Sequence, residues 1–499
     1  MRLWLPLLLA LAVCASPALA QNGLSLGGPF SDGMIIQRGQ AVPVWGKAES
    51  GSTVTIALGA ETVETVAAAD GNWRVDLAPR EAATGVSLTV RAATEQIEVS
   101  DIAFGDVFLC SGQSNMAWKM SASALRPEDR NPVIDKLIRL LTVPSISSQV
   151  EEGQLGAAAR WVSASEGWLD FSAVCLFMGR SLAESGGVPV GLVNSSWGGT
   201  PIEAWMPLEA LAAVGGLDDH VALLQKYRRD RGSAEVEHGT VLSDLWEGRP
   251  NPLRRVKGKE GYANLFNGMI APLGPTRFAG AVWYQGENNA NNAAGTARYR
   301  ALLEALIGSW RQRSGGHLPF VVVQLAGYGK LGSLPDNDDW ADVREAQRLV
   351  ARADPDTELV VTIDVSERLD IHPPIKKPIG RRAAAAIRKL AFGDADAYRP
   401  PEALGARRMK DQVDIAISTG RSPLYAASWG RPGPFLLCAD TTALDCRFAD
   451  ATFSGEGIRV AVPGGFKPAT VRYCWDAAPI CNVFDQDEIP LGPFELTIE

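Results

Sequence analysis

The pattern of apolar and polar residues divides the chain into three parts, and the first part alternates as β-strands do. Between residue 23 and about residue 102, short segments alternate between apolar and polar positions or are rich in β-branched residues. Asp70-Gly71 separates two such segments and is a typical hairpin turn pair. We therefore expect a small N-terminal β-sandwich domain over residues 21–104.

In the second part, apolar strands alternate with segments of helical spacing. Strands that are apolar throughout and separated by helices are typical of a parallel sheet covered by helices on both faces. We expect this α/β domain to span residues 105–394. The expected strands are residues 107–109, 191–194, 279–283, 320–324 and 359–363, and the expected helices are residues 174–185, 298–313, 340–352 and 378–390.

A charged stretch interrupts the α/β rhythm, and a third part follows it. Residues 225–262 contain RRDRG and RRVKGKEG, which indicates an insertion that forms a solvated face or the flank of a lid. After residue 394 the alternation of strands returns, for example at residues 413–417, 457–462 and 471–475. We expect a C-terminal β-domain over residues 395–499.

The N-terminus has the three parts of a secretory signal peptide. Arg2 is followed by an apolar run over residues 3–13 and by small residues before Gln21. We assign residues 1–20 to the signal and expect an exported protein, periplasmic or extracellular. The run is too short to span a bilayer, and no later stretch approaches the roughly 18 apolar residues of a membrane helix, so no membrane span is expected.

The net charge limits the possible binding partners, and the cysteine content bears on the cellular compartment. The net charge is −9, which argues against nucleic acid as a partner. Six of the 7 cysteines lie beyond the signal, where an oxidising compartment allows pairing. Cys110 and Cys175 lie in apolar segments and are interpreted equally well as buried free thiols. Two other pairs are close enough to close short loops as disulfides: Cys438 with Cys446, and Cys474 with Cys481.

The stretch FLCSGQSNMAWKM, residues 108–120, places a serine directly after an expected strand. A loop at the C-terminal end of such a strand is held by the sheet while its side chains stay accessible. Ser114 is therefore a candidate nucleophile. A helix N-cap is the alternative interpretation, so partners for Ser114 must be sought elsewhere.

Partners for Ser114 lie in three more polar loops that follow strands. These loops are NSSWGGTPIEAW (194–205), WYQGENNAN (283–291) and DIHPPIKKPIGRR (370–382). Of the four histidines, only His372 follows a strand, and Asp370 lies two residues before it. A serine hydroxyl needs an imidazole base, and the imidazole needs a carboxylate that orients it. We expect Ser114, His372 and Asp370 to act together.

The same loops offer donors for an oxyanion and surfaces for a sugar. The N–H groups of Ser114 and Gly199, with an amide from Asn289 or its neighbour Asn288, could form the oxyanion hole. No HExxH motif or Cys/His cluster is present, so neither a metal nor a cofactor is expected. Aromatic faces and amides bind sugars well. The candidate sugar-binding residues are Gln113, Trp197, Trp283 and Gln285, and a non-catalytic sugar-binding protein would also use Trp205 as a platform.

Four ordered motifs carry a resemblance to a known family. CSGQSNM, NSSWGGTPIEAW, WYQGENN and DIHP resemble the sequence blocks of the sialate O-acetylesterase family, a branch of the SGNH hydrolases. The flanking β-regions also look like those of that family. The resemblance implies a flavodoxin-like three-layer α/β/α hydrolase domain, Ser114 as nucleophile, His372 as base, and metal-free hydrolysis of acetyl esters on carbohydrate hydroxyls.

One departure from the SGNH pattern leaves the acid partner open. Many SGNH enzymes carry an aspartate three residues before the catalytic histidine, where this chain has Leu369. Asp370 is favoured by its proximity to His372. Glu287 is the rival, because related acetylesterases are thought to use the glutamate of this block.

The substrate suggested by the resemblance is an O-acetyl ester of a sialic acid. Acetylated xylan or xyloglucan is the alternative, and a non-catalytic carbohydrate-binding protein is the alternative of another class. A sialic acid carries a carboxylate, which calls for a cation near His372. The basic residues available after this histidine are Lys376, Lys377, Arg381 and Arg382.

Overall fold

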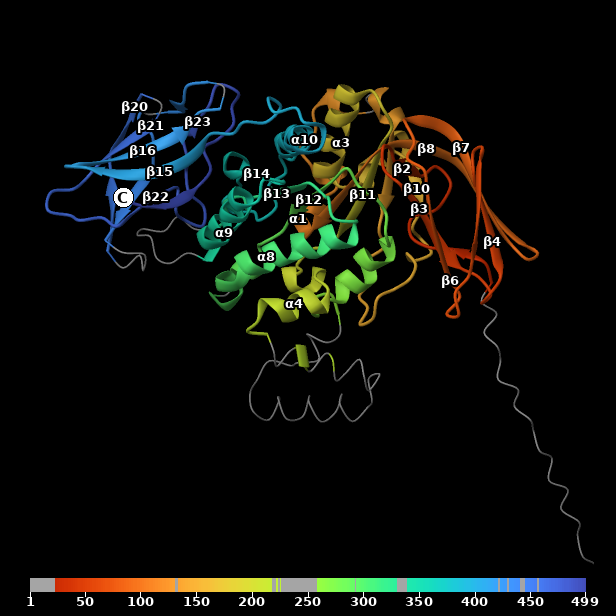
Figure 1. Ribbon diagram of the computed structural model, residues 1–499. Helices are drawn as coiled ribbons and strands as arrows, with labels where there is room; N and C mark the ends of the chain where they lie inside the picture. The colour runs from red at the N-terminus through yellow and green to blue at the C-terminus, as the bar shows by residue number, and fades with distance from the viewer. Residues whose placement is uncertain are drawn as a thin grey trace, which may run out of the picture.

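The computed structural model arranges the chain as N-terminal β-sheets, a central α/β part and C-terminal β-sheets in a row (Figure 1). The expected signal at residues 1–20 and most of the expected insertion at residues 225–262 lie outside the described residues. None of the helices within the described ranges has the length and apolar character needed to cross a membrane. The structure describes residues 23–130, 133–217, 221–222, 225, 258–291, 293–329, 339–420, 422–428, 430–439, 445–455 and 457–499.

Two β-sheets enclose the N-terminal core. Their strands are β1 (Ser25–Leu26), β2 (Ile35–Gln37), β3 (Val42–Lys47), β4 (Thr53–Leu58), β5 (Glu61–Val66), β6 (Asn72–Leu77), β7 (Ala83–Ala92) and the long β8 (Glu95–Gly112). One sheet has the order β1-β3-β6, and in the other β4 lies between β5 and β7, with β7 paired to β8. Alternate residues of β3, β4, β6 and β7 are buried in one hydrophobic cluster, which explains the period of two in the sequence.

Strand β8 belongs to both the N-terminal and the central part. Its first half pairs antiparallel with β7, and Ala103 pairs parallel with Ile35 of β2. Its second half runs parallel to two strands of the central sheet, β11 (Val190–Ser196) and β12 (Gly280–Tyr284). The expected boundary between residues 104 and 105 thus lies inside one continuous strand, which both parts share.

The central sheet has the order β10-β9-β11-β8-β12-β13-β14. Its remaining strands are β9 (Ile138–Thr142), β10 (Trp161–Ser163), β13 (Phe320–Val323) and β14 (Thr357–Val360). Strand β10 is antiparallel to β9, whereas the other neighbours in this sheet are parallel. All five strands expected from the sequence are present, but β14 ends at Val360 and the expected end at residue 363 lies in the turn η9 (Ile363–Val365). Strands β9 and β10 were not expected, because their short segments carry no long apolar run.

Helices cover both faces of this sheet (Figure 1). Helices α3 (Ala173–Gly186) and α10 (Lys377–Phe392) pack against the face that buries Phe108, and α8 (Ala293–Arg313) and α9 (Asp339–Ala353) pack against the face that buries Leu109. The four expected helices are confirmed. Helices α3 and α10 approach closely at Gly380, where a Cβ atom would lie 2.5 Å from Phe177 Cβ.

Short helices connect the main elements. The α-helices are α1 (Ser114–Ala117), α2 (Ala164–Gly167) and α4 (Leu208–Val214), and the 3₁₀ or π turns are η1 (Met120–Ala122), η2 (Pro127–Asp129), η3 (Val133–Leu137), η4 (Trp168–Asp170), η5 (Ile202–Trp205), η6 (Phe266–Ile270), η7 (Ala271–Leu273), η8 (Asn289–Asn291) and η9 (Ile363–Val365).

The interpretation of Cys110 and Cys175 as free thiols is wrong, because the two residues form a disulfide. Cys110 points from β8 toward the sheet face that α3 covers, and Cys175 lies in the first turn of α3. Both residues are fully buried, and their Cα atoms are 6.0 Å apart. Packing of α3 on the sheet brings together two cysteines that are 65 residues apart, so sequence spacing gave no sign of the pair.

The described residues of the C-terminal part form three small β-sheets. Its strands are β15 (Glu402–Met409), β16 (Gln412–Ser418), β17 (Tyr425–Ala426), β18 (Phe435–Cys438), β19 (Cys446–Ala449), β20 (Ala451–Ser454), β21 (Gly457–Ala461), β22 (Thr470–Tyr473), β23 (Val483–Phe484) and β24 (Phe494–Thr497). The sheets have the orders β15-β16-β21-β20, β19-β18-β22-β24 and β17-β23, and the two larger ones share a hydrophobic core. The expected disulfides Cys438–Cys446 and Cys474–Cys481 are confirmed.

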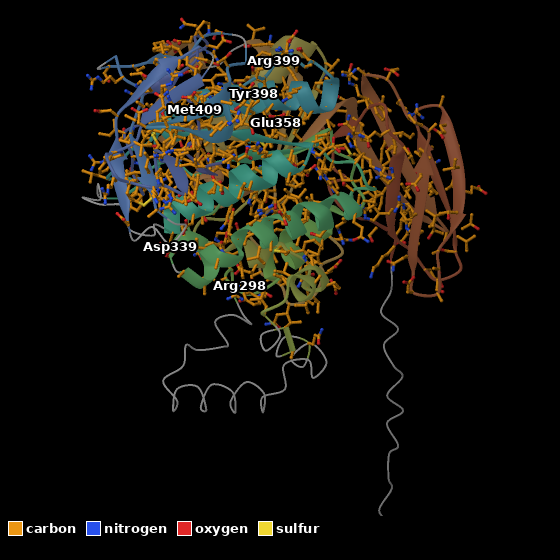
Figure 2. All side chains as sticks on the ribbon, turned by 60° about the vertical axis from the view of Figure 1, so that its left-hand side comes forward. Arg298, Asp339, Glu358, Tyr398, Arg399 and Met409 are labelled. Atoms are coloured by element: carbon orange, nitrogen blue, oxygen red, sulfur yellow. A yellow bond between two sulfur atoms is a disulfide. The ribbon has the colours of Figure 1, made fainter. Side chains whose placement is uncertain are left out.

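Side chains of the central part hold the C-terminal strands in place. Arg344 on α9 donates to the carbonyl of Ala477, and Arg382 on α10 donates to the carbonyl of Glu488. Tyr398, in the segment that enters the C-terminal part, donates its hydroxyl to the carbonyl of Leu359. Figure 2 shows Tyr398 where the central part meets the C-terminal strands. These bonds tie the C-terminal part to α9, α10 and β14 of the central part.

Candidate active site

The loops that carry the predicted site residues meet at the carboxyl edge of the central sheet. Gly112, the last residue of β8, pairs with Ser196 of β11 and with Tyr284 of β12. Its φ is +138°, and a Cβ atom there would lie 2.1 Å from the carbonyl oxygen of Tyr284. Only glycine permits this close approach. The chain therefore leaves β8 directly between the other two loops.

Ser114 opens the short helix α1, with Gln113 at the N-cap position. The structure therefore places Ser114 one residue inside the helix, and the N-cap interpretation of Ser114 is wrong. The side chain is half-buried, and the described part of the chain offers no hydrogen-bond partner to its Oγ. The turn at Gly198 closes over Ser114, since a Cβ atom on Gly198 would lie 3.1 Å from Ser114 Cβ.

His372 is held beside the nucleophile loop by aromatic stacking. Its ring stacks on that of Trp118, which caps the C-terminus of α1, with the ring centroids 5.0 Å apart. Burial lowers the pKa of His372 below its usual value, the nearby cation of Lys376 lowers it further, and Asp370 raises it. The imidazole is therefore neutral at neutral pH, which is the state that a general base requires.

The two candidate acid partners have different surroundings. Asp370 Oδ1 accepts a hydrogen bond of 2.9 Å from the backbone N–H of His372 and lies 3.8 Å from His372 Nδ1. Glu287 is 2% exposed, and its Oε1 accepts a bond of 2.6 Å from Asn115 Nδ2. Burial raises the pKa of Glu287. Asp370 is thus brought to the imidazole, whereas the bond of Glu287 is to the residue after Ser114.

Two lysines near the site make contacts within the protein that the sequence did not predict. Lys376 was considered as a cation for substrate, but it is 0% exposed and its Nζ lies 2.5 Å from Asn115 Oδ1. Burial lowers the pKa of Lys376 to about 7. Lys259 comes from the end of the charged insertion, and its Nζ donates a 2.6 Å bond to the carbonyl of Gly198. Nothing in the local sequence distinguishes these two lysines from exposed ones.

Two of the three other basic residues expected near His372 form ion pairs within the protein, and all three lie on α10. Lys377 forms an ion pair with Asp129, and Arg382 forms one with Asp364. Arg381 is exposed.

The candidate oxyanion donors Gly199 and Asn288 lie at the glycine turn beside Ser114, whereas the side chain of Asn289 is engaged elsewhere. Gly199 lies in the turn beside Ser114, and its carbonyl accepts a 3.1 Å bond from Asn288 Nδ2. Asn289 is buried, its Oδ1 accepts from the N–H of Ile202, and its Nδ2 donates to Glu203. The side chain of Asn289 thus braces the 200–205 loop, while Asn288 lies at the glycine turn.

Three of the expected sugar-binding side chains have no exposed surface. Trp283 is enclosed edge-on by Trp205 and Trp310, and Trp205 is equally buried. Gln285 donates to the carbonyl of Thr200 and is 0% exposed. The expectation that these residues bind sugar is therefore wrong, because in a fully packed core no face remains for a ligand.

Two sugar-binding candidates stay close to the site. Gln113 is buried at the N-cap of α1, and its Oε1 accepts a bond from the N–H of Asn288. Trp197 is half-buried and packs against the hydrophobic core beside the glycine turn. Gln113 therefore ties two loops together, and Trp197 keeps part of its ring accessible.

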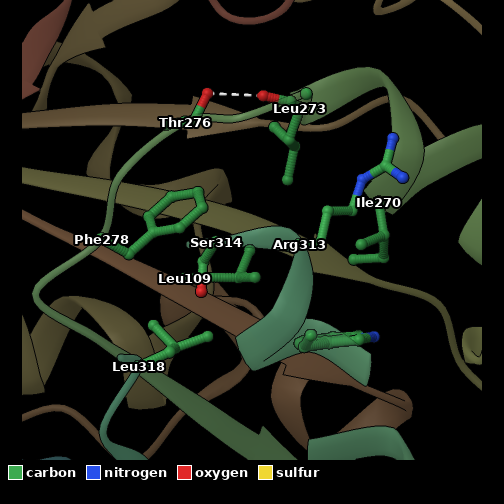
Figure 3. Close-up of a pocket in the computed structure, with 10 residues that line it drawn as sticks. Leu109, Ile270, Leu273, Thr276, Phe278, Arg313, Ser314 and Leu318 are labelled. Atoms are coloured by element: carbon green, nitrogen blue, oxygen red, sulfur yellow. Dashed lines mark hydrogen bonds between the residues drawn. The ribbon is translucent and has the colours of Figure 1, made fainter. Parts of the chain in front are cut away.

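A pocket elsewhere in the central part is lined by none of the predicted site residues (Figure 3). Its lining is mostly apolar and includes Leu109, Phe278 and Leu318, with Arg313 at one side.

Within the described ranges, no group of three His, Cys, Asp or Glu side chains is arranged to hold a metal ion.

Comparisons with known proteins identify relatives of this chain. Residues 237–388 match the family model described as "Carbohydrate esterase, sialic acid-specific acetylesterase". The chain is 30% identical to a sialate O-acetylesterase of Rattus norvegicus over 404 residues, 72% of each chain, and 30% identical to that of Homo sapiens over 413 residues, 74% of this chain and 72% of the relative.

A solved structure extends the likeness to nearly the whole chain. The crystal structure of a carbohydrate acetylesterase from Xanthomonas citri has a TM-score of 0.79 and 29% sequence identity, and covers 94% of this chain and 99% of its own. The fold is therefore that of a carbohydrate esterase, a mixed α/β part with additional β-sheets. The chain belongs to the sialate O-acetylesterase family of carboxylic ester hydrolases.

Proposed function

We propose that this protein is a serine esterase that removes O-acetyl groups from sugars, with Ser114 as nucleophile and His372 as general base. The observation that carries the proposal is the meeting of Ser114, the Gly198-Gly199 turn and His372 at one sheet edge. A hydroxyl, an imidazole with a lowered pKa and backbone N–H groups are the parts that acyl transfer by a serine requires.

The reaction follows from these parts. Ser114 Oγ attacks the acetyl carbonyl while the imidazole of His372 accepts the hydroxyl proton. The negative charge on the carbonyl oxygen is stabilised by the N–H groups of Ser114 and Gly199 and by the side-chain amide of Asn288. His372 then gives this proton to the sugar oxygen as the bond between that oxygen and the acetyl carbon breaks, so the sugar leaves with a free hydroxyl and the acetyl group stays on Ser114. Water, activated by the same imidazole, hydrolyses the acetyl-serine and releases acetate.

Asp370 is the proposed orienting carboxylate. Its carboxylate is 3.8 Å from His372 Nδ1, a charge–charge distance longer than a hydrogen bond, and it fixes the turn through the N–H of His372. Glu287 is assigned a different role, because its hydrogen bond goes to Asn115.

The proposed domain architecture is a flavodoxin-like three-layer SGNH hydrolase domain between two β-domains. Strand order supports it. When β8, β11, β12, β13 and β14 are numbered 1 to 5, their spatial order is 2-1-3-4-5, the order of flavodoxin-like sheets. Ligands bind such sheets at the carboxyl ends of the strands, which is where Ser114 lies.

The proposed substrate is an O-acetylated sialic acid. Two relatives are named sialate O-acetylesterases, and Lys259 places an ammonium group at the glycine turn, where it can meet a sugar carboxylate. A neutral acetylated polysaccharide, xylan or xyloglucan, is the second candidate. It is favoured by the engagement of Lys376, Lys377 and Arg382 within the protein.

Export is also proposed. Three disulfides in the described part of the chain support it, because disulfides persist mainly in oxidising compartments.

Acetate release tests the function. Wild-type protein and the Ser114→Ala variant are compared on O-acetylated sialic acid, acetylated xylan and acetylated xyloglucan, with Ser121→Ala, an exposed serine in η1, as control. Ser114→Ala should lower kcat by at least about 10³-fold, while Ser121→Ala should not change it. Near-normal turnover in Ser114→Ala would refute the nucleophile, and activity only on long-chain acyl esters would refute the substrate class.

A further inference from the structure

A chain of three polar side chains is buried beneath the predicted catalytic residues. Lys376 Nζ donates to Asn115 Oδ1 over 2.5 Å, and Asn115 Nδ2 donates to Glu287 Oε1 over 2.6 Å. All three side chains are 2% exposed or less. They come from the start of α10, from α1 and from the loop after β12, so three separate segments meet in one hydrogen-bonded chain.

Asn115 also connects the loops of the two predicted catalytic residues. Its Nδ2 donates a second bond, of 2.9 Å, to the carbonyl of Ile371. Asn115 directly follows Ser114, and Ile371 directly precedes His372. Both amide hydrogens and the carbonyl oxygen of Asn115 are thus engaged, and one side chain sets the spacing between the nucleophile and the base. A shift of about 1 Å in such spacing can cost about 10²-fold in rate.

The charges at the two ends of this chain are poorly solvated. Lys376 Nζ lies 5.7 Å from the ring centroids of both Trp118 and Tyr284. Glu287 Oε2 has no hydrogen-bond partner among the described residues. Replacing a buried ion pair by apolar groups is often neutral or stabilising, so stability alone does not require these charges here. Their contact with the loops of the catalytic residues points to a role in geometry.

We infer that Lys376, linked through Asn115 to Glu287, is a positioning residue for the reaction and holds the Ser114 loop in register with the His372 loop. The inference rests on the proposed function. The charge of Lys376 also acts on His372. The titratable groups around it are Glu287, Asp370, His372 and the Tyr284 hydroxyl, and its charge lowers the pKa of His372.

The test is the near-isosteric variant Lys376→Met, which removes the donor to Asn115 and keeps the bulk of the side chain. We expect kcat on O-acetylated sialic acid, or on p-nitrophenyl acetate, to fall by about 10²-fold with KM changed less than about 3-fold. The acidic limb of kcat/KM should move to higher pH, because the cation that lowers the pKa of His372 is gone. A merely structural role would not move this limb.

Lys389→Met is the matched control. Lys389 lies on the same helix and pairs with Glu358, away from Ser114, so this variant should retain both kcat and the acidic limb. Unchanged kcat and an unchanged acidic limb in Lys376→Met, with Ser114→Ala inactive, would overturn the inference while leaving the proposed function in place. Activity of Ser114→Ala would instead overturn the proposed function.

A second variant covers the case in which Lys376→Met does not fold. Lys376→Met combined with Glu287→Gln removes both buried charges, and the glutamine still accepts from Asn115. We expect this double variant to fold, as judged by circular dichroism and thermal unfolding, and to show the same loss of kcat, because Asn115 Oδ1 still lacks its donor. Wild-type kcat in the folded double variant would overturn the inference.

Discussion

The charge of Asp370 should assist the reaction only modestly, and Asp370→Asn measures this contribution. Asparagine has the same shape, and its Oδ1 can still accept the hydrogen bond from the N–H of His372. The turn before the histidine is therefore retained, and the substitution removes the negative charge alone.

The distance and exposure of Asp370 set the expected magnitude. Two unit charges 3.8 Å apart attract by about 1 kcal/mol in water and about 4 kcal/mol at an effective dielectric constant of about 20. The Asp370 side chain is 59% exposed, so solvent screens the pair and the lower figure applies. Loss of about 1 kcal/mol of imidazolium stabilisation corresponds to a fall in kcat of about 5-fold.

The pH profile gives the variant a second readout. Asp370 raises the pKa of His372, so its loss should lower that pKa further. Since the neutral imidazole is the active form, the acidic limb of kcat/KM should move to lower pH, the opposite of the shift expected for Lys376→Met.

The assay is acetate release from pH 4 to 9, with Glu367→Gln as control because it removes an exposed carboxylate three residues upstream. Two results would refute the reasoning. A fall in kcat of about 10³-fold or more would mean that the carboxylate bonds directly to the imidazole during the reaction. A shift of the acidic limb to higher pH would mean that Asp370 does not act on His372 as a charge.

Three further predictions concern specificity, the glycine turn and the disulfide. Lys259→Met should lower kcat/KM for O-acetylated sialic acid by about 10-fold more than for acetylated xylan, since only the first substrate carries a carboxylate; equal losses would remove Lys259 from specificity. Gly198→Ala should lower kcat by about 10- to 100-fold with little change in thermal unfolding, because the new methyl group would lie in close contact with Ser114 Cβ and displace it. Full activity would show that the turn moves away from Ser114 instead. Replacing Cys110 and Cys175 by alanine should lower the free energy of unfolding in urea by about 4 kcal/mol, as a loop of this length predicts, and a loss below about 1 kcal/mol would contradict that estimate.

The sequence by itself determined the order of the elements and the identity of the loops at the site. Apolar strands alternating with helices specify a helix-covered parallel sheet, because such strands have no face that can remain in water. The carboxyl ends of parallel strands lie at one edge, so the sequence could predict that Ser114 and His372 share a site. The sequence also predicted the disulfides Cys438–Cys446 and Cys474–Cys481, because each pair is close enough in sequence to close a short loop.

Only the tertiary structure decided which polar and aromatic residues face the solvent and which face each other. The sequence around Trp283 and Gln285 suggests sugar binding, yet both residues are buried, since burial depends on which helices cover the end of β12. Cys110 meets Cys175 because α3 packs on β8. Lys376 resembles a solvated helix start, and its contact with Asn115 arises where three distant segments converge, a convergence that no local pattern encodes.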